Sequence, residues 1–145
     1  MKIPRKSAIR LILSEEARAE GNGKFSLLGV FPGERFQVAG ETPPVGFEQF
    51  AFVLPSLAFV FVITDGEGRV PSKLSVLGPD KKPLFPETEI ANGIEIKKGS
   101  PAIFLSGLRP FLGPKFGAYT IVLKMGKTAV FKFPFQVEKA PAPKK

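Results

Sequence analysis

The stretch FGAYTIVLKMGKTAVFKFPFQVEK, residues 116–139, decides the fold class of this chain. Apolar residues alternate along residues 118–125 and again along residues 128–137, which is the period of a half-buried β-strand. Gly126 and Lys127 separate the two runs and predict a tight turn. We therefore predict a β-hairpin whose inward faces are Tyr119, Ile121, Leu123 and Met125 on the first strand and Phe131, Phe133, Phe135 and Val137 on the second.

Tyr119 and Pro134 indicate how this hairpin is placed. Pro134 has no amide hydrogen to donate to a ladder, so we expect an edge position or a bulge there. Tyr119, the only tyrosine of the chain, begins the penultimate strand two residues after Gly117. This arrangement resembles the tyrosine corner of immunoglobulin-like sandwiches, in which the hydroxyl binds an upstream connection. We expect a structural role for Tyr119.

The rest of the chain carries strand signals of the same kind. Fifteen Pro and fifteen Gly interrupt it, and no window has a sustained apolar repeat at helical spacing. Residues 56–64, SLAFVFVIT, are apolar on both faces and predict a central strand. The chain is therefore predicted to be all-β: a two-sheet, immunoglobulin-like β-sandwich of about seven to nine strands with phenylalanines between the sheets. Further strands are expected at residues 7–14, 24–31, 34–39, 72–77, 93–98 and 102–108.

The sequence GNGK at residues 21–24, followed closely by Ser26, resembles the end of a phosphate-binding loop. That motif needs a glycine five positions before its second glycine, and a helix whose first amides hold the anion. Arg18 occupies the required glycine position, and an alternating strand pattern follows Lys24. We interpret Asn22 and Gly23 as a structural hairpin turn, because both tolerate a positive φ.

The residue inventory removes several kinds of chemistry. The 145-residue chain has no cysteine and no histidine, which excludes thiol catalysis, zinc–thiolate sites, disulfides and histidine-based triads. Its acidic residues fall mostly in expected turns, and TDGEG at residues 64–68 is interpreted as a turn and not as a calcium loop. We expect a non-enzymatic protein with no metal site and no cofactor.

Length and charge suggest one domain and limit its partners. We expect a single β-sandwich domain over residues 1–138 and a basic tail rich in proline and alanine over residues 139–145. The net charge is +8, but residues 2–6 contribute +3 and residues 138–145 contribute +2, which leaves +3 for the body. Because basic ends are commonly solubilising, we expect no nucleic-acid partner.

The N-terminus does not predict targeting to a membrane. Its apolar run is short, is interrupted by Arg10 and leads into two glutamates, which is unlike a secretory signal. No segment approaches the roughly 18 apolar residues of a membrane span. We expect a cytoplasmic protein of a bacterial-type cell or, if it is phage-encoded, a protein of the host cytoplasm or the virion.

Four segments in order resemble a bacterial and phage-associated β-sandwich family of unknown function. They are SEEARAEGNGKFSLLGVF near the start, PSLAFVFVI in the middle, SVLGPDKKPLF after it, and the hairpin of residues 116–137. The shared features are an Asn/Asp-Gly-Lys hairpin, a Gly-x-Tyr strand and a final Phe-rich strand. These motifs are structural, so the resemblance implies a fold and no activity. GPDKKP stands where such a turn commonly carries Asp-Gly.

The second apolar face of residues 57–63 has to be covered by something. In a sandwich the opposite sheet covers one face of each strand, so the other face needs either the connection ETPPVGFEQFAFVLP, residues 41–55, or another protein. We predict a homo-oligomer or a complex with a protein partner, through an apolar sheet face. The interface candidates are Val60, Val62, Val122 and Val130.

An alternative function is the sequestration or sensing of an anionic, nucleotide-type ligand. It requires basic side chains at turns and strand ends to converge on one rim, whereas the simpler interpretation is a solvated surface. The anion-binding candidates are Lys97, Lys98, Lys115, Lys124, Lys127 and Lys132.

Overall fold

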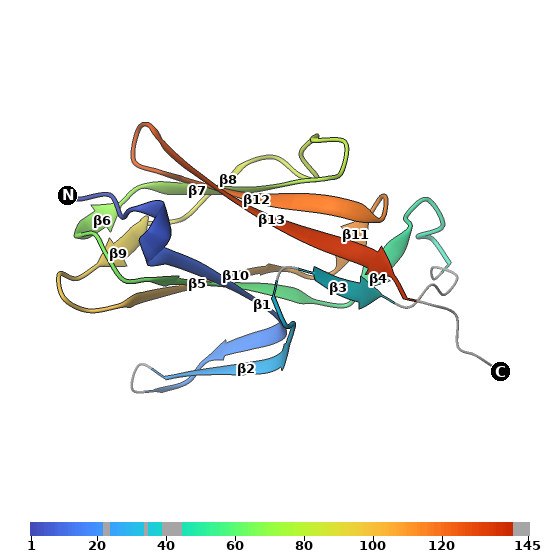
Figure 1. Cartoon of the computed structure of the whole chain (residues 1–145), viewed down its shortest axis with the longest axis horizontal. Helices are drawn as coiled ribbons and strands as arrows, with labels where there is room; N and C mark the ends of the chain where they lie inside the picture. The colour runs from blue at the N-terminus through green and yellow to red at the C-terminus, as the bar shows by residue number, and fades with distance from the viewer. Residues whose placement is uncertain (22–23, 34, 39–44, 141–145) are drawn as a thin grey trace.

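The computed structural model of the chain describes residues 1–21, 24–33, 35–38 and 45–140, and this part is all-β (Figure 1). One short 3₁₀ turn, η1, precedes the first strand, and the alternating runs predicted from the sequence form the longer strands. The elements are η1 (Lys6–Ala8), β1 (Ile9–Ala19), β2 (Phe25–Val30), β3 (Arg35–Val38), β4 (Phe52–Leu54), β5 (Leu57–Ile63), β6 (Gly68–Val70), β7 (Ser72–Leu77), β8 (Thr88–Glu89), β9 (Ile94–Ile96), β10 (Ala102–Leu108), β11 (Phe111–Gly113), β12 (Gly117–Met125) and β13 (Ala129–Lys139).

Two larger sheets form the layers of the molecule. One has the order β10-β5-β1-β2 and the other the order β3-β13-β12-β7-β8. Their strands pair antiparallel except β3 and β13, which run parallel. The small ribbons β6–β9 and β4–β11 lie at opposite ends of the two layers (Figure 1). The predicted all-β class is confirmed, and β5 is an inner strand as expected.

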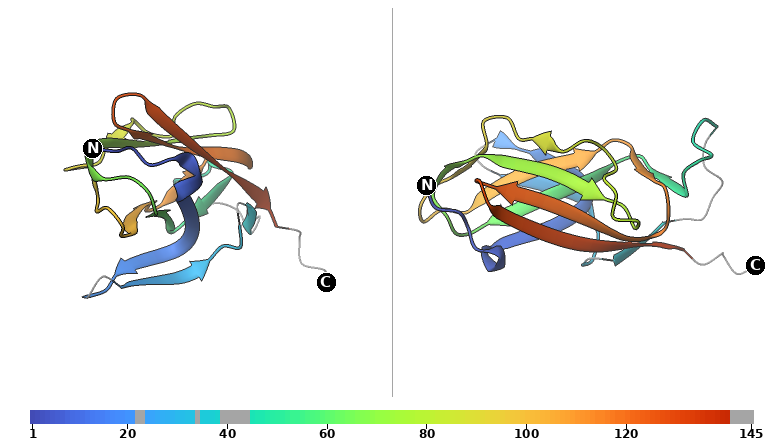
Figure 2. Two further views of the ribbon diagram at one scale, coloured as in Figure 1. Left: turned by 60° about the vertical axis from the view of Figure 1, so that its left-hand side comes forward. Right: turned by 90° about the horizontal axis from the view of Figure 1, so that it is seen from above.

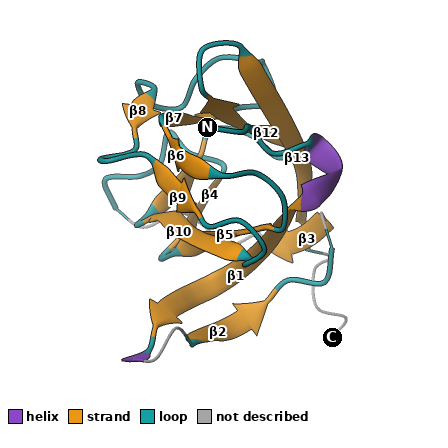
Figure 3. Cartoon of the chain, turned by 90° about the vertical axis from the view of Figure 1, so that its left-hand side faces the viewer, coloured by secondary structure: helices purple, strands orange, loops and turns teal. Residues whose placement is uncertain are grey.

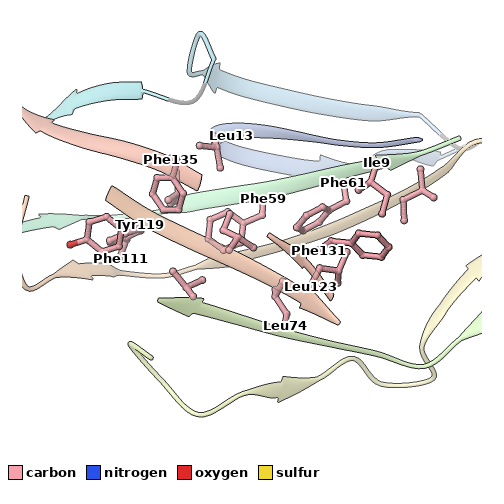
Figure 4. Close-up of a cluster of buried hydrophobic side chains, with 14 of the residues drawn as sticks. Ile9, Leu13, Phe59, Phe61, Leu74, Phe111, Tyr119, Leu123, Phe131 and Phe135 are labelled. Atoms are coloured by element: carbon pink, nitrogen blue, oxygen red, sulfur yellow. The ribbon is translucent and has the colours of Figure 1, made fainter. Parts of the chain in front are cut away.

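The core lies between the two sheets and is built from the predicted faces (Figure 4). The inward side chains of β5 and β12 are completely buried, and those of β13 are buried or partly buried. Complete burial of one such side chain stabilises the fold by about 1.5–3 kcal/mol. The buried residues of β5 and β12 are Leu57, Phe59, Phe61, Ile63, Tyr119, Ile121, Leu123 and Met125.

An aromatic cluster closes the end of the core near β4 and β11. The Tyr119 ring lies 5.4 Å from Phe111 and 5.5 Å from Phe135, measured between ring centroids. The Tyr119 hydroxyl donates a hydrogen bond to the backbone carbonyl of Lys115, in the connection just upstream of β12. Gly113 lies directly against Phe52, and a Cβ atom there would meet the ring at 2.1 Å, so glycine is required at this position.

Some details differ from the sequence-based expectation. β1 starts after the 3₁₀ turn and continues to Ala19, because its second half pairs with β2. β13 has neighbours on both sides at its end, but β3 pairs with it only from Gln136 onward, so Pro134 lies where β13 is locally an edge, as expected, and no β3 carbonyl there requires an amide hydrogen from the proline. The described residues form thirteen strands. Some of them have only two or three residues, β8 among them, and so short a run carries no detectable alternation.

Two predicted features fall largely outside the described residues. They are the turn at Asn22 and Gly23 and most of the basic tail, from Pro141 onward.

The β1–β2 hairpin leaves the body of the sandwich. Residues 9–14 of β1 pair with β5, whereas residues 14–19 pair with β2. The ribbon bends between these halves, so that the hairpin projects below β5 and β10 (Figures 1 and 2). The first half of β1 therefore belongs to the sandwich, and the second half carries β2 away from it.

Candidate functional site

The side of the four-stranded sheet that faces away from the core is largely apolar. Strand register places Ile12 of β1, Val60 of β5 and Leu105 of β10 in one row across it. The next row holds Arg10, Val62 and Ile103. These residues alternate with the core residues along each strand, so their side chains point to the opposite side.

β2 extends this side of the sheet onto the projecting hairpin. Val30 stands opposite Ser14 and Leu28 stands opposite Glu16, and residues directly opposite each other share a face. Leu28 is 51 % exposed, Val30 52 % and Ile103 39 %. We call the whole surface the outer apolar face, which comprises Ile12, Leu28, Val30, Val60, Val62, Ile103 and Leu105.

The middle of the outer apolar face is shielded by its own neighbours. Val60 is only 2 % exposed although it points away from the core, and it lies between Ile12 and Leu105. Ser14, on the same side, is fully buried and donates its hydroxyl hydrogen to the Glu16 carbonyl at 3.2 Å. The accessible part of the face is therefore its margin at Ile103 and its extension on β2.

Arginines stand at both ends of the outer apolar face. Glu16 accepts from Arg18 at 3.1 Å and lies 3.6 Å from the guanidinium of Arg109, which follows β10. Arg10 is exposed at the other end. The outer apolar face therefore has an apolar centre and a rim that contains arginines at both ends.

The structure does not bring the four predicted valines into one patch. Val60 and Val62 belong to the outer apolar face, whereas Val122 and Val130 point outward from the five-stranded sheet. Residues that point away from the core in two facing sheets point in opposite directions. Val130 is 50 % exposed, and Val122 is 6 % exposed between Ser75 and Lys132.

The predicted cover of residues 41–55 is described only from Val45 onward. This part carries β4, which pairs with β11 at the end of the sandwich, and Phe52, which enters the core.

The six lysines proposed for anion binding lie in three places. Lys97 and Lys98 follow β9, and Lys115 precedes β12. The third place is the β12–β13 hairpin, where Lys127 lies in the turn and Lys124 and Lys132 lie on the two strands. Only Lys124 and Lys127 of these line a hollow of about 250 Å³, whose other walls are Pro71, Ser72, Lys73, Glu87, Glu89, Gly126, Thr128, Ala129 and Val130.

Glutamates already balance the lysines of this hollow. Lys124 and Lys73 are direct cross-strand neighbours, and like charges in that position repel. The Lys124 ammonium is 2.8 Å from the Glu87 carboxylate, and Glu89 stands opposite Lys73. The hydrogen bond from Lys124 lowers the pKa of Glu87, and the charge of Lys73 adds to this. An anionic ligand would have to displace these carboxylates.

The TDGEG segment is a turn in which Asp65 pairs with basic side chains near the N-terminus. The Asp65 carboxylate lies 3.1 Å from Arg5 and 3.4 Å from Lys2. The backbone amide of Gly66 is the main cause that lowers the Asp65 pKa. Within the described ranges, no cluster of three or more acidic side chains could hold a metal ion.

Comparison with known proteins adds no relative. No family model, no curated protein and no solved structure matches the chain. The resemblance to a bacterial and phage-associated family therefore stays a prediction. Across the part of the chain that the structure describes, no helix is long and apolar enough to cross a membrane.

Sequence reasoning missed Ile12, Leu28, Val30, Ile103 and Leu105 as surface residues. The available signal was their alternation with core residues, but the shared face becomes visible only after β10, β5, β1 and β2 are placed side by side.

Proposed function

We propose that the chain is a non-enzymatic protein-interaction or assembly module, built on an immunoglobulin-like sandwich, whose contact surface is the outer apolar face. The strand order supports the immunoglobulin-like part of this proposal. Only the short strand β6 separates β5 from β7 in the chain, and only β11 separates β10 from β12, yet the members of each pair lie in different sheets, as in Greek-key sandwiches. The bond from the Tyr119 hydroxyl to the Lys115 carbonyl has the form of a tyrosine corner.

One observation carries the functional part. Three large apolar side chains, Leu28, Val30 and Ile103, are 39–52 % exposed on one side of one sheet. Each Å² of apolar surface removed from water contributes about 25 cal/mol, so contact through this side is favourable. Apolar patches of this kind usually mark interaction sites. The arginines at both ends supply a polar rim.

The nucleotide-type alternative has less support, because its six lysines are dispersed and the best-placed one is bound to Glu87.

Two matched substitutions test the proposal. Ile103→Lys places a charge on the outer apolar face, and Val130→Lys places the same charge on a similarly exposed valine of the other sheet. We expect the unmodified protein to sediment above monomer mass or to co-purify with a protein partner. Ile103→Lys should release the assembly, and Val130→Lys should leave it intact.

Circular dichroism and melting temperature verify that both variants fold. A monomeric protein at high micromolar concentration without a bound partner would contradict the proposal. Equal behaviour of the two lysine variants would also contradict it.

A further inference from the structure

β10 is an outer strand of the four-stranded sheet, and its free edge is regular and unprotected. Within the described residues β10 pairs with β5 alone, and all seven of its residues stand opposite β5 in one unbroken register. Its sequence, AIFLSGL, contains no charged residue and no proline, which are the residues that block unwanted pairing at natural edges. β9 lies beside the start of β10 but pairs with β6, so it forms no ladder with β10 (Figure 3).

The other outer strands are less suited to pairing with a new strand. β3 carries Arg35, and β8 has only two residues. β2 is uncharged, but its Gly29 has a φ of +65° and lies against the Glu15 side chain, so the ladder between β2 and β1 is interrupted there. β10 is therefore the longest uninterrupted open edge among the described residues.

The hydrogen-bond phase fixes which groups of β10 point to the open edge. The Thr64 amide donates to the Ala8 carbonyl at 2.9 Å, directly beside the β1–β5 ladder and in its register. Because bonded positions alternate along a strand, the even-numbered residues of β5 bond to β1 and the odd-numbered ones bond to β10. Each odd-numbered residue of β5 stands opposite an even-numbered residue of β10. The interior residues of β10 that direct their backbone N–H and C=O groups to the open edge are thus Ile103, Leu105 and Gly107.

These three positions also belong to the outward side of the sheet. Ile103 and Leu105 are members of the outer apolar face, and Ile103 is 39 % exposed. A Cβ atom at Gly107 would meet the Leu57 carbonyl oxygen at 2.7 Å, so glycine is required there. Gly107 is exposed and has no side chain, so it leaves room on the outward side for a large side chain of a neighbouring strand.

Basic side chains stand at both ends of β10. The turn of residues 97–100, which is closed by a backbone hydrogen bond to the Lys97 carbonyl, leads into the strand and carries Lys97 and Lys98. Both lysines are exposed, and no acidic side chain of the described residues lies within ion-pair distance of them. Arg109 follows the strand and lies 3.6 Å from Glu16. In a chain of net charge +8, these ends attract acidic groups.

We propose that the open edge of β10 binds an extended segment of another protein as an added antiparallel strand, and that this segment carries acidic residues at both of its ends. The proposal rests on the proposed function and names the form of the partner. Three alternate residues of the segment stand opposite Ile103, Leu105 and Gly107 and bond to their backbone groups. Their apolar side chains extend the outer apolar face. In this mode of recognition the main-chain bonds supply affinity and the alternate side chains supply specificity.

Charge disfavours a second copy of the chain as the added strand. Antiparallel pairing of two β10 strands would bring Arg109 of each copy beside Lys97 and Lys98 of the other. Like charges in such positions repel. An acidic segment has the opposite charge at both ends, so it is the occupant that this edge fits.

A short peptide tests the backbone pairing. The probe is Asp-Asp-Phe-Thr-Val-Thr-Val-Asp-Asp with blocked ends, whose phenylalanine stands opposite Gly107 and whose first valine stands opposite Leu105 in the proposed register. One derivative carries N-methyl groups on these two residues, which removes the amide hydrogens that bind the Gly107 and Leu105 carbonyls. The matched derivative carries them on the two threonines, whose amides point away from β10. Both derivatives have the same side chains and the same charge.

Binding to the whole chain is measured by fluorescence anisotropy of labelled peptides. We expect the threonine-methylated derivative to bind like the unmodified probe. The other derivative should bind at least tenfold more weakly, because two main-chain hydrogen bonds are lost. Absence of probe binding at millimolar concentration, or equal binding of the two derivatives, would overturn the proposal.

Hydrogen exchange of single amides locates the bound strand. The unmodified probe should slow exchange at the Leu105 and Gly107 amides and leave Phe104 and Ser106, which already bond to β5, unchanged. Slowed exchange confined to other strands would overturn the proposal. Exchange at Leu105 and Gly107 that is already slow without peptide, and slower at higher protein concentration, would assign the edge to a second copy and would overturn it too.

Two matched double substitutions test the acidic chemistry of the partner. Lys97→Glu with Lys98→Glu reverses the charge beside the start of β10, and Lys81→Glu with Lys82→Glu makes the same change in the turn after β7, in the other sheet. All four lysines are exposed. We expect the first pair to weaken probe binding several-fold at low salt and the second pair to have little effect. Equal effects of the two pairs would contradict an acidic partner at this edge.

The outcome is separable from that of the proposed function. If Ile103→Lys releases an assembly but the two methylated peptides bind equally, the apolar-face function stands and pairing at β10 is wrong. If the probe binds with the expected dependence on methylation but Ile103→Lys releases no assembly, pairing at β10 stands and the contact through the face is wrong.

Discussion

Replacing Tyr119 by phenylalanine isolates one hydroxyl at the closed end of the core. The ring stays among Phe52, Phe111 and Phe135, so only the hydrogen bond to the Lys115 carbonyl is lost. A hydrogen bond of this type contributes about 1 kcal/mol net, and the exposed position of Lys115 lets water reach the freed carbonyl. We expect Tyr119→Phe to lower the free energy of unfolding by about 1 kcal/mol at neutral pH, or roughly 3 °C in melting temperature.

The same substitution should have the opposite effect in strong base. Burial raises the Tyr119 pKa from 10.0 to about 12. Between these values the unfolded chain loses the phenolic proton and the folded chain keeps it, so the folded state binds more protons and its stability falls as the pH rises. Each pH unit costs about 1.36 kcal/mol, which gives a loss of up to about 2.7 kcal/mol by pH 12. The phenylalanine variant has no such loss, so the order of the two stabilities inverts.

Two measurements check this reasoning. The chain has one tyrosine and no tryptophan, so the ultraviolet absorbance of tyrosinate reports Tyr119 alone and gives its pKa in the folded protein. Urea unfolding followed by circular dichroism at neutral pH and at about pH 11.5 then compares the two proteins. Lysine deprotonation affects both alike and cancels in the difference. An ordinary tyrosine pKa, or a stability difference that does not change with pH, would refute the argument.

Two further predictions concern the proposed surfaces. Val60→Lys should reduce the free energy of unfolding by several kcal/mol, because the new ammonium has to replace a side chain that is 2 % exposed between Ile12 and Leu105. A melting temperature equal to that of Ile103→Lys would contradict the shielded position of Val60. Nucleotides and cyclic oligonucleotides should leave the melting temperature unchanged, because the carboxylates of Glu87 and Glu89 already balance the ammonium groups of Lys124 and Lys73. A ligand that binds would instead stabilise the fold by about 2.7 kcal/mol at a hundredfold excess over its dissociation constant, and this result would favour the anion-binding alternative.

The central hairpin of the sandwich could be predicted from sequence because its signal is local. Tyr119, Ile121 and Leu123 are two residues apart and fully buried, and the turn at Gly126 separates two runs of the same period. Burial of one face fixes such a strand strongly, since a slip by one residue would expose every apolar side chain. The same holds for Phe59 and Phe61 on β5.

Other features depend on contacts that a sequence pattern does not contain. The extension of β1 to Ala19 runs through Glu15, Glu16 and Arg18, which show no apolar alternation. These residues are held in a strand by the ladder with β2 and by the bond between Arg18 and Glu16. The short strands β4, β6, β8 and β11 likewise exist through their partners, because two or three residues carry no period.

The candidate surface could be predicted only in part from the sequence, and the incorrect grouping of its residues has a definite cause. Outward positions were identified correctly on β5, β12 and β13, but the sequence does not say which strands share a sheet. Once the sheets are known, the outward residues separate into two chemical classes. Those of the five-stranded sheet include Lys73, Ser75, Thr120, Lys124 and Lys132, which water solvates readily.

The outward residues of β5 and β10 include no charged side chain; they are Ala58, Val60, Val62, Ile103, Leu105 and Gly107. The two layers share one core and have the same alternation, so core packing does not account for this difference. An outward face that served only solubility would carry polar residues in both layers. This difference between β5 and β10 on one side and the five-stranded sheet on the other is the reason that we propose a contact on the β10-β5-β1-β2 side, and that Ile103 and Val130, although similarly exposed, are expected to respond differently to the same lysine.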